Sequence, residues 1–333
     1  MTGQDQNTPV EILYPTVRMR RLRSSARFRG MVRENHVTAS DLIYPLFFEE
    51  NSESTTPITS MPGISRYPET KIPEVLGELS RDGVQAVMLF GVSNHKDATG
   101  SDSLRSEGFL SRMIRAAKRA DTGMLIMADI CFCEYTDHGH CGIIENGDMH
   151  NDQSLENLVA QAVIAADSGA DVIAPSGMLD GMVQALRHGL DSTGHSQIPI
   201  LSYSSKFASC FYGPFRDAAG SHLDGDRKTY QMDFANGREA LRESLLDEAE
   251  GADMLMVKPG MPYLDVLARL RERTDLPLAV YQVSGEYAMI KFASAAGALD
   301  EDDAITESLT AFKRAGADLI LSYFTPHYIR NLL

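Results

Sequence analysis

The chain alternates short apolar runs with longer amphipathic stretches along most of its length. Several of the apolar runs are nearly continuous in Val, Ile, Leu and Met, which is typical of parallel strands buried on both faces. The runs predict strands at 42–48, 86–92, 124–132, 172–175, 198–203, 254–257, 278–283 and 319–323. Apolar positions with a helical period predict helices that include 155–168, 238–250, 263–273 and 305–315.

Three of the predicted strands begin after the same tripeptide, Gly-Ala-Asp, at 169–171, 251–253 and 316–318. In each, glycine is expected to end a helix and the chain to turn directly into a strand. Eight strand–helix units over about 290 residues predict an α/β fold, a (β/α)8 TIM barrel. A doubly wound open sheet is the alternative, and it is less favoured because no G-x-G-x-x-G turn follows any predicted strand.

Charge is distributed unevenly along the 333 residues, which carry a net charge of −15. Residues 1–40 hold seven arginines and a charge of +4, so the remainder carries −19. Such an extended basic N-terminal arm could bind nucleic acid, or it could pack on an acidic neighbouring subunit. The second interpretation is favoured because so acidic a body repels nucleic acid. We therefore expect an oligomer arm at 1–40, a catalytic barrel at 41–333 and no nucleic-acid partner.

Composition also limits the cellular location. The longest apolar runs fall far short of the ~20 residues of a membrane span, and the N-terminus has no apolar signal core. Four cysteines, three of them clustered, do not form a disulfide framework and suit a reducing compartment. The sequence predicts a cytoplasmic protein that does not bind a membrane.

Three of the four cysteines lie within eleven residues, at Cys131, Cys133 and Cys141. If the strand continues through them, Cys131 and Cys133 share a face, and Cys141 can return after a Gly-His turn. Three thiolates leave one position of a zinc tetrahedron open, as in a catalytic site. His138 or His140 could instead complete a structural site. The spacing matches no common zinc finger, so catalytic zinc, structural zinc and no metal all remain open from spacing alone.

Most predicted strands end in a side chain that can do chemistry. Reactive residues of such barrels lie at the C-terminal strand ends. The residues at these positions are Asp129, Cys131, Cys133, Ser176, Lys206, Lys258, Ser284 and Tyr323. A purely structural barrel would not need this pattern.

Two lysines end apolar or small-residue runs, Lys206 and Lys258. Burial lowers the pKa of a lysine and yields a neutral amine, which attacks ketones to form a Schiff base. If both face one pocket, each disfavours the charge of the other. The alternatives are a Lys258 that is paired with a buried carboxylate or reaches the rim, and a Lys206 exposed in a loop.

Residues 207–231 form a long insert between a strand and a helix, and such loops of barrels are usually active-site lids. Arg216 and Arg227 within it could grip a substrate carboxylate. The alternative is a loop held by its own Arg–Asp pairs.

Two stretches carry a specific resemblance: YSSKFASCFYGPFRDA at 203–218 and MVKPGMPY at 256–263. With 129–142 and 281–286, they resemble the porphobilinogen synthases (5-aminolaevulinate dehydratases), over a region from about Arg18 to Tyr328. The resemblance implies a TIM barrel with an arm that wraps a neighbour, commonly in a homo-octamer. It also implies that two 5-aminolaevulinate molecules condense to porphobilinogen with loss of two waters, in tetrapyrrole biosynthesis.

The resemblance assigns roles residue by residue. Lys258 and Lys206 match the Schiff-base lysines of the propionate-side and acetate-side substrates, and Cys131, Cys133 and Cys141 match the ligands of a catalytic zinc. An open fourth position would take the acetate-side substrate or a water. The expected substrate-binding residues are Asp129, which matches an acidic residue near the metal, and Ser176. They also include Arg216, Arg227 and Gln231 on the acetate side, and Ser284 and Tyr323, with Tyr281 nearby, on the propionate side.

A second ion is implied at Glu243, which matches a carboxylate that binds an allosteric magnesium. Alternatively, Glu243 is a solvated helix residue that pairs with Arg238 or Arg242. The chain departs from the family pattern at Glu134, where proline is expected, and at Gly177, where aspartate is expected. Glu134 and Asp137 are expected to add negative charge beside the zinc and to affect its affinity.

Two rival functions fit part of the pattern. A class I aldolase on the same barrel would need only one Schiff-base lysine and no cysteine cluster. A structural zinc protein that uses its arm to bind partners would leave Lys258 unexplained. Pyrrole formation from 5-aminolaevulinate discriminates among the three.

Overall fold

The computed structural model describes residues 16–220 and 225–333, and the chain divides into two compact units after His36. The described part of the first unit holds a 3-10 helix at Met19–Arg23 and the helix α1 at Ala26–Met31. The hydroxyl of Ser25 begins α1 by accepting a hydrogen bond from the Phe28 N–H at 3.2 Å. The assignment of residues 1–40 to oligomer contacts stays a prediction, and residues 1–15 lie outside the described residues.

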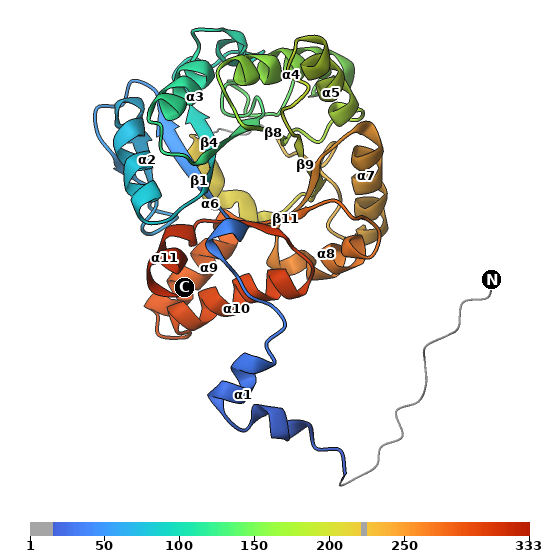
Figure 1. The fold of residues 1–333 in the computed structure, drawn as a ribbon. Helices are drawn as coiled ribbons and strands as arrows, with labels where there is room; N and C mark the ends of the chain where they lie inside the picture. Colours follow the sequence, from blue (N-terminus) through green and yellow to red (C-terminus); the bar gives the residue numbers. More distant parts are fainter. Residues whose placement is uncertain (1–15, 221–224) are drawn as a thin grey trace, which may run out of the picture. The chain divides into compact units, whose positions relative to one another are not determined.

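The second unit is a barrel of eight parallel strands (Figure 1). In chain order they are β1 (Leu42–Glu49), β4 (Ala86–Val92), β5 (Leu125–Ile130), β8 (Val172–Pro175), β9 (Leu201–Lys206), β10 (Met254–Lys258), β11 (Leu278–Gln282) and β12 (Leu319–Ser322). Neighbours in the sheet run β8-β5-β4-β1-β12-β11-β10-β9. A parallel bridge between Ile173 and Ile200 joins the two end strands. The predicted (β/α)8 fold is therefore confirmed.

Helices surround the strands as an outer ring (Figure 1). They are α2 (Ile72–Arg81), α3 (Phe109–Arg119), α4 (Asn151–Asp167), α5 (Met182–Ser192), α7 (Gly237–Glu250), α8 (Leu264–Arg271), α9 (Ser284–Ala295), α10 (Glu301–Arg314) and α11 (Thr325–Asn331). The short helix α6 (Gly213–Ala219) belongs instead to the insert after β9. Minor strands pair as β2 (Thr56–Pro57) with β3 (Ser65–Pro68) and β6 (Ile144–Glu145) with β7 (Asp148–Met149). None of the helices within 16–220 and 225–333 is long and apolar enough to cross a membrane.

Strand boundaries follow the apolar pattern closely, with two differences that bear on the site. β4 and β8 have their predicted bounds. β5 ends at Ile130, two residues early, so Cys131 and Cys133 lie in the following loop rather than on a strand. β9 runs from Leu201 to Lys206, three residues later than predicted, because its polar end is buried and hydrogen-bonded.

The three Gly-Ala-Asp segments share a structural role. Their glycines adopt φ values of +99°, +105° and +108°, which favour glycine at a helix end. Each aspartate then accepts a 2.8 Å hydrogen bond from the backbone N–H of a residue at the start of a neighbouring strand. The pairs are Asp171 with Ile126, Asp253 with Ile200, and Asp318 with Leu278. The repeat therefore ends a helix and fixes the strand that follows it beside the strand that precedes that helix.

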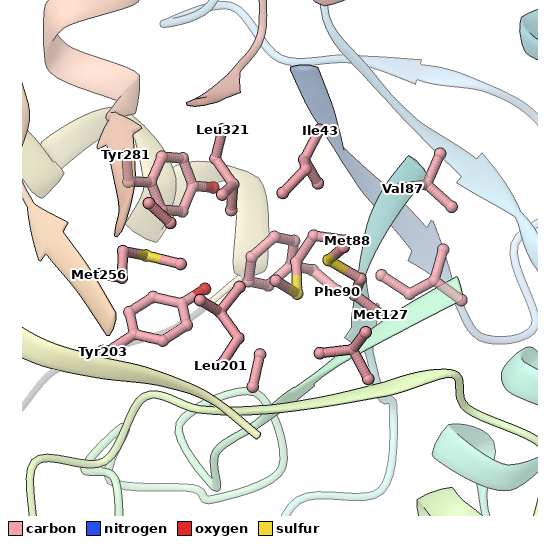
Figure 2. Close-up of a cluster of buried hydrophobic side chains, with 14 of the residues drawn as sticks. Ile43, Val87, Met88, Phe90, Met127, Leu201, Tyr203, Met256, Tyr281 and Leu321 are labelled. Carbon is pink, nitrogen blue, oxygen red and sulfur yellow. The ribbon is translucent and has the colours of Figure 1, made fainter. Parts of the chain in front are cut away.

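The barrel interior is filled by side chains from nearly every strand (Figure 2). Ile43, Met88, Leu201 and Leu321 are at most 1% exposed. Tyr203, Met256 and Tyr281, from three strands in sequence around the barrel, also extend into this cluster (Figure 2). The interior is thus a packed core, and the ligand-accessible space must lie at one end.

Candidate active site

A cavity of about 920 Å³ opens where the strands end at their C-termini. Eleven of the fourteen predicted site residues line it. They are Asp129, Cys133, Ser176, Lys206, Arg216, Arg227, Gln231, Lys258, Tyr281, Ser284 and Tyr323. The cavity size suits small molecules, although the individual roles of these residues stay predictions.

The two lysines meet because of an irregularity in β9. Lys206 and Lys258 are register partners in the β9–β10 ladder, and the register shifts between Ser202 and Ser205. One extra residue on β9 forms a bulge. Ser204 and Ser205 both lie within hydrogen-bonding distance of the Ser244 hydroxyl of α7, at 2.9 and 2.8 Å, on the outer side of the strand. Tyr203 and Lys206 can therefore both face the interior, although they are three residues apart.

The amines of the two lysines have different surroundings. Lys206 Nζ donates a hydrogen bond to the Ser176 carbonyl oxygen at 2.5 Å. Lys258 Nζ lies 4.2 Å from the ring centroid of Tyr281 and 4.8 Å from that of Tyr203. Burial, reinforced by the positive charge of Lys206, lowers the pKa of Lys258 to about 7. The neutral, nucleophilic form of Lys258 is thus accessible near neutral pH.

Asp129 lies at the end of β5 and is 4% exposed. Its Oδ2 accepts a hydrogen bond from the Ser176 hydroxyl at 3.1 Å. Its Oδ1 has no partner within the described part of the chain. Burial raises the pKa of Asp129, against the opposing effect of the two lysines. An unpaired buried oxygen beside both amines is suited to exchange a proton with a bound molecule.

Cationic and amide groups line another wall of the cavity. Arg227 donates a 2.7 Å hydrogen bond to the Gly139 carbonyl oxygen, which ties the insert to the cysteine loop. Arg227 Nε and the buried Gln231 Nε2 have no hydrogen-bond partner among the described residues. Arg216 is exposed on α6 and also lines the cavity. Donors without partners, gathered in one place, suit a carboxylate ligand.

Hydroxyl groups form the wall near Lys258. Tyr281 and Tyr323 have hydroxyl oxygens 3.1 Å apart. Ser284, at the start of α9, accepts a 2.9 Å hydrogen bond from the Phe215 N–H. It also donates to the Phe211 carbonyl oxygen at 3.3 Å. Ser284 therefore connects the insert to the barrel at the cavity edge.

The three clustered cysteines form a candidate metal centre. Cys131, Cys133 and Cys141 are buried, and their sulfurs all lie within 4.8 Å of one another. The sulfurs of Cys131 and Cys133 are 3.4 Å apart. Tetrahedral zinc, with Zn–S bonds near 2.3 Å, needs sulfur separations of about 3.8 Å. The donor set and its spacing therefore fit a thiolate-bound metal.

Histidine does not join this cluster among the described residues. His138 Nε2 lies 3.2 Å from the Ala98 carbonyl oxygen, and His140 Nδ1 lies 3.1 Å from the Tyr230 hydroxyl. A three-thiol site leaves one tetrahedral position for another ligand, which favours the catalytic over the structural interpretation.

The two departures from the family pattern lie close to the cysteines. Glu134 is 1% exposed, and burial raises its pKa well above the usual range. The neutral form of Glu134 is therefore favoured, which reduces the negative charge that was expected beside the cysteines. Asp137, the other acid expected to add charge there, is exposed. At Gly177, an added Cβ would make only ordinary contacts, of 3.7 Å or more.

Glu243 lies on α7 outside the cavity and is half-buried. Burial and the neighbouring charges of Asp180, Glu250 and Glu239 raise its pKa, while Arg242 opposes the rise. The concentration of carboxylates is compatible with a cation site, and magnesium binding stays a prediction.

Four residues at the site were not predicted from the sequence. Tyr203, Tyr212 and Phe215 surround Lys258, and their only sequence signal is the density of aromatic residues around Lys206. Glu286 is fully buried, and its carboxylate accepts hydrogen bonds from the N–H groups of Val283 (2.7 Å) and Gly260 (3.2 Å), and from that of Met261. A single buried acid four residues after a strand gave no such signal.

A (β/α)8 barrel with ionisable side chains gathered at the strand ends has the organisation of a barrel enzyme. A sequence profile of the family described as delta-aminolevulinic acid dehydratase matches residues 16–331. The chain belongs to this family.

Individual relatives are similar over nearly the whole chain. The delta-aminolevulinic acid dehydratase of Escherichia coli (strain K12) is 55% identical and covers 92% of this chain and 95% of its own. That of Helicobacter pylori (strain J99) is 50% identical, with 95% and 98% covered. The crystal structure of the Toxoplasma gondii ME49 enzyme (porphobilinogen synthase), in complex with the reaction product porphobilinogen, aligns with a TM-score of 0.92. It is 45% identical and covers 94% of this chain and 91% of its own.

Proposed function

We propose that this cavity condenses two molecules of 5-aminolaevulinate to porphobilinogen. One C–C and one C–N bond form, and the two ketone oxygens leave as two molecules of water. The observation that carries the proposal is the pair of buried amines, Lys206 and Lys258, side by side at adjacent strand ends in one cavity. Two ketones need two activating amines, whereas an aldolase needs one.

Lys258 is proposed to bind the substrate that supplies the propionate side chain. Its amine attacks the ketone carbon, and the resulting carbinolamine loses water to give an iminium ion. The lowered pKa supports this role because a neutral amine is required for attack. Ser284 and Tyr323, which line the cavity, would bind the carboxylate of this substrate, with Tyr281 hydrogen-bonded to Tyr323.

Lys206 is proposed to bind the substrate that supplies the acetate side chain. Arg216, Arg227 and Gln231 would hold its carboxylate, since their donors line the same cavity. Asp129, held by Ser176, would accept or return a proton at its unpaired Oδ1. Arg227 also lies close to the three cysteines, and, against the effect of burial, their negative charge raises the pKa of its guanidinium.

Cys131, Cys133 and Cys141 are proposed to hold a zinc ion. A bound zinc with an open position supplies Lewis-acid activation of an oxygen or nitrogen ligand. Around it, the chain supplies fixed sulfur positions, the cation of Arg227 and the hydroxyl of Tyr230, which packs on the thiol cluster.

Two further features are proposed to act at the level of assembly. The arm would dock on the acidic barrel of another copy, in a homo-octamer, because it is basic and exposes Val17, Met19, Phe28 and Met31 by 47–82%. Glu243 would hold an allosteric magnesium ion, which keeps most of its water ligands and needs few from protein.

Incubation of the purified protein with 5-aminolaevulinate tests the central proposal. Porphobilinogen should accumulate, and borohydride should trap substrate covalently on Lys258. The proposal fails if a thiol-reduced, zinc-saturated preparation forms no pyrrole. A product with one new C–C bond and no ring would favour an aldolase.

A further inference from the structure

Four aromatic rings surround the amine of Lys258. Its Nζ lies 4.2 Å from the ring centroid of Tyr281, 4.8 Å from that of Tyr203, 5.4 Å from that of Phe215 and 5.5 Å from that of Tyr212. All four distances fall within the ~6 Å over which a cation is attracted to a ring face. We call these four rings the Lys258 cage.

The neighbouring amine provides an internal comparison. Among the described residues, Lys206 Nζ lies over one ring, that of Tyr203 at 5.6 Å, and it is oriented by a hydrogen bond to the Ser176 carbonyl oxygen. Within residues 16–220 and 225–333, Lys258 Nζ makes no direct hydrogen bond or ion pair, and the Asp129 carboxylate attracts its charge without contacting it. One amine is therefore oriented by a carbonyl oxygen, whereas the rings are the groups that Lys258 Nζ faces directly.

The two halves of the cage come from different parts of the chain. Tyr203 on β9 and Tyr281 on β11 belong to the packed barrel interior (Figure 2). Tyr212 and Phe215 belong to the insert after β9. The Tyr212 hydroxyl donates to the carbonyl oxygen of Phe207 at 2.8 Å, and the Phe215 ring meets that of Phe90 edge-on at 5.2 Å. The insert thus contributes two of the four rings, and both residues that carry them are fixed by contacts with neighbouring groups.

The electrostatics of such a cage select a cationic nitrogen. A ring face carries negative potential, so it attracts a cation and is nearly indifferent to a neutral amine. Unlike a carboxylate, a ring has no basic site that can take the proton of an iminium ion. The cage can therefore stabilise a positive charge at this nitrogen without removing its proton.

We propose that Tyr203, Tyr212, Phe215 and Tyr281 stabilise the iminium ion that forms on Lys258, and that the insert makes this ion more stable than the one on Lys206. This inference rests on the proposed Schiff-base function. In the step concerned, the Nζ lone pair forms a C–N bond to the ketone carbon as the C–O π bond breaks. The carbinolamine then takes up one proton and releases its hydroxyl as water, which leaves a C=N⁺–H group among the rings.

The sharpest test changes the charge of one ring face and leaves its shape nearly unchanged. Phe215 is replaced by phenylalanines carrying one, two and three ring fluorines, which progressively remove the negative potential of the face. The holoenzyme is incubated with 5-aminolaevulinate and cyanoborohydride, and peptide mass spectrometry measures the reduced adduct separately at Lys258 and Lys206. The same substitutions at Phe292, 53% exposed on α9, are the matched control.

We expect the initial rate of trapping at Lys258 to fall stepwise with fluorine number, by about tenfold over the series, while trapping at Lys206 and in the Phe292 series stays constant. Phe215→Leu should resemble the most fluorinated ring. A Lys258 rate that is independent of fluorination, or an equal fall at both lysines, overturns the inference. Absence of trapping in the unmodified enzyme would instead overturn the proposed function, so the two failures are distinguishable.

Discussion

Lys206 and Lys258 are direct partners in the parallel ladder between β9 and β10, and both side chains line the same cavity. The bulge at Ser204 and Ser205 makes this possible, because without it the spacing from Tyr203 would turn either the tyrosine or Lys206 outward. The positive charge of Lys206 at the adjacent strand end then helps burial to lower the pKa of Lys258. The chemistry of the site thus depends on one extra residue in one strand.

Replacement of either lysine by arginine tests the covalent role. Lys258→Arg keeps the positive charge but cannot supply a neutral amine. Porphobilinogen formation should fall on the order of 10³-fold or more, with no adduct at residue 258 and with an unchanged circular dichroism spectrum. Lys291→Arg, at a surface pair with Glu301, is the control and should retain activity. Turnover near the normal rate in Lys258→Arg would contradict the mechanism.

The pKa of Lys258 predicts the pH dependence of trapping. With a pKa of about 7, most of the amine is protonated below that pH and neutral above it. The trapping rate at Lys258 should therefore rise between about pH 6 and pH 8 and then level off. Lys206→Met removes a neighbouring positive charge, so the pKa of Lys258 should rise and the midpoint should move to higher pH. A midpoint that stays in place, or moves down, would show that the lysines are not coupled.

Metal removal should abolish activity and leave the barrel folded. The cysteine cluster is a buried satellite in a loop, whereas the barrel has its own extensive core. A chelator or a mild thiol oxidant should stop turnover reversibly while the unfolding transition moves little. Cys131→Ala combined with Cys133→Ala should give the same result. Cys210→Ser, which removes the exposed thiol outside the cluster, is the control. Melting of the chelated protein would instead identify a structural metal.

The sequence predicts the barrel well because its strands are buried on both faces, so that β4 and β8 are visible as continuous apolar runs. It misplaces β9 because Ser204 and Ser205 look like loop residues. Their burial depends on hydroxyl partners on α7 and on a bulge, neither of which leaves a periodic signal. Tyr203, Tyr212 and Phe215 are missed because they lie near Lys206 in the sequence, whereas the amine that they surround is that of Lys258 on the neighbouring strand β10.

Glu286 is predicted to position Lys258. Its carboxylate binds the N–H groups of Gly260 and Met261, just after the lysine, and that of Val283, next to Ser284. Glu286→Gln replaces one acceptor oxygen by a donor that faces an N–H group, which should lower the free energy of unfolding by about 1–3 kcal/mol.

The positioning role has its own readout. At a temperature where the Glu286→Gln variant is fully folded, trapping at Lys258 should fall more than trapping at Lys206. Glu301→Gln removes one side of the partly exposed ion pair with Lys291, on another helix. This variant should leave the ratio of trapping at Lys258 to trapping at Lys206 unchanged. Equal losses at the two lysines would indicate a structural role alone.

Magnesium is predicted to raise activity through Glu243. The half-buried carboxylate lies among Asp180, Glu239 and Glu250, whose charges, after burial itself, raise its pKa. A cation there relieves this repulsion, so it should stabilise the assembly that binds it. Activity at saturating zinc should therefore rise with magnesium. The rise should not exceed the roughly 5–150-fold that is typical of allosteric coupling. Glu243→Ala should remove the rise and keep the basal rate, whereas Glu272→Ala, an exposed acid beyond α8, should keep both. If the wild type shows no response, or if Glu243→Ala retains it, Glu243 is only a surface residue of α7.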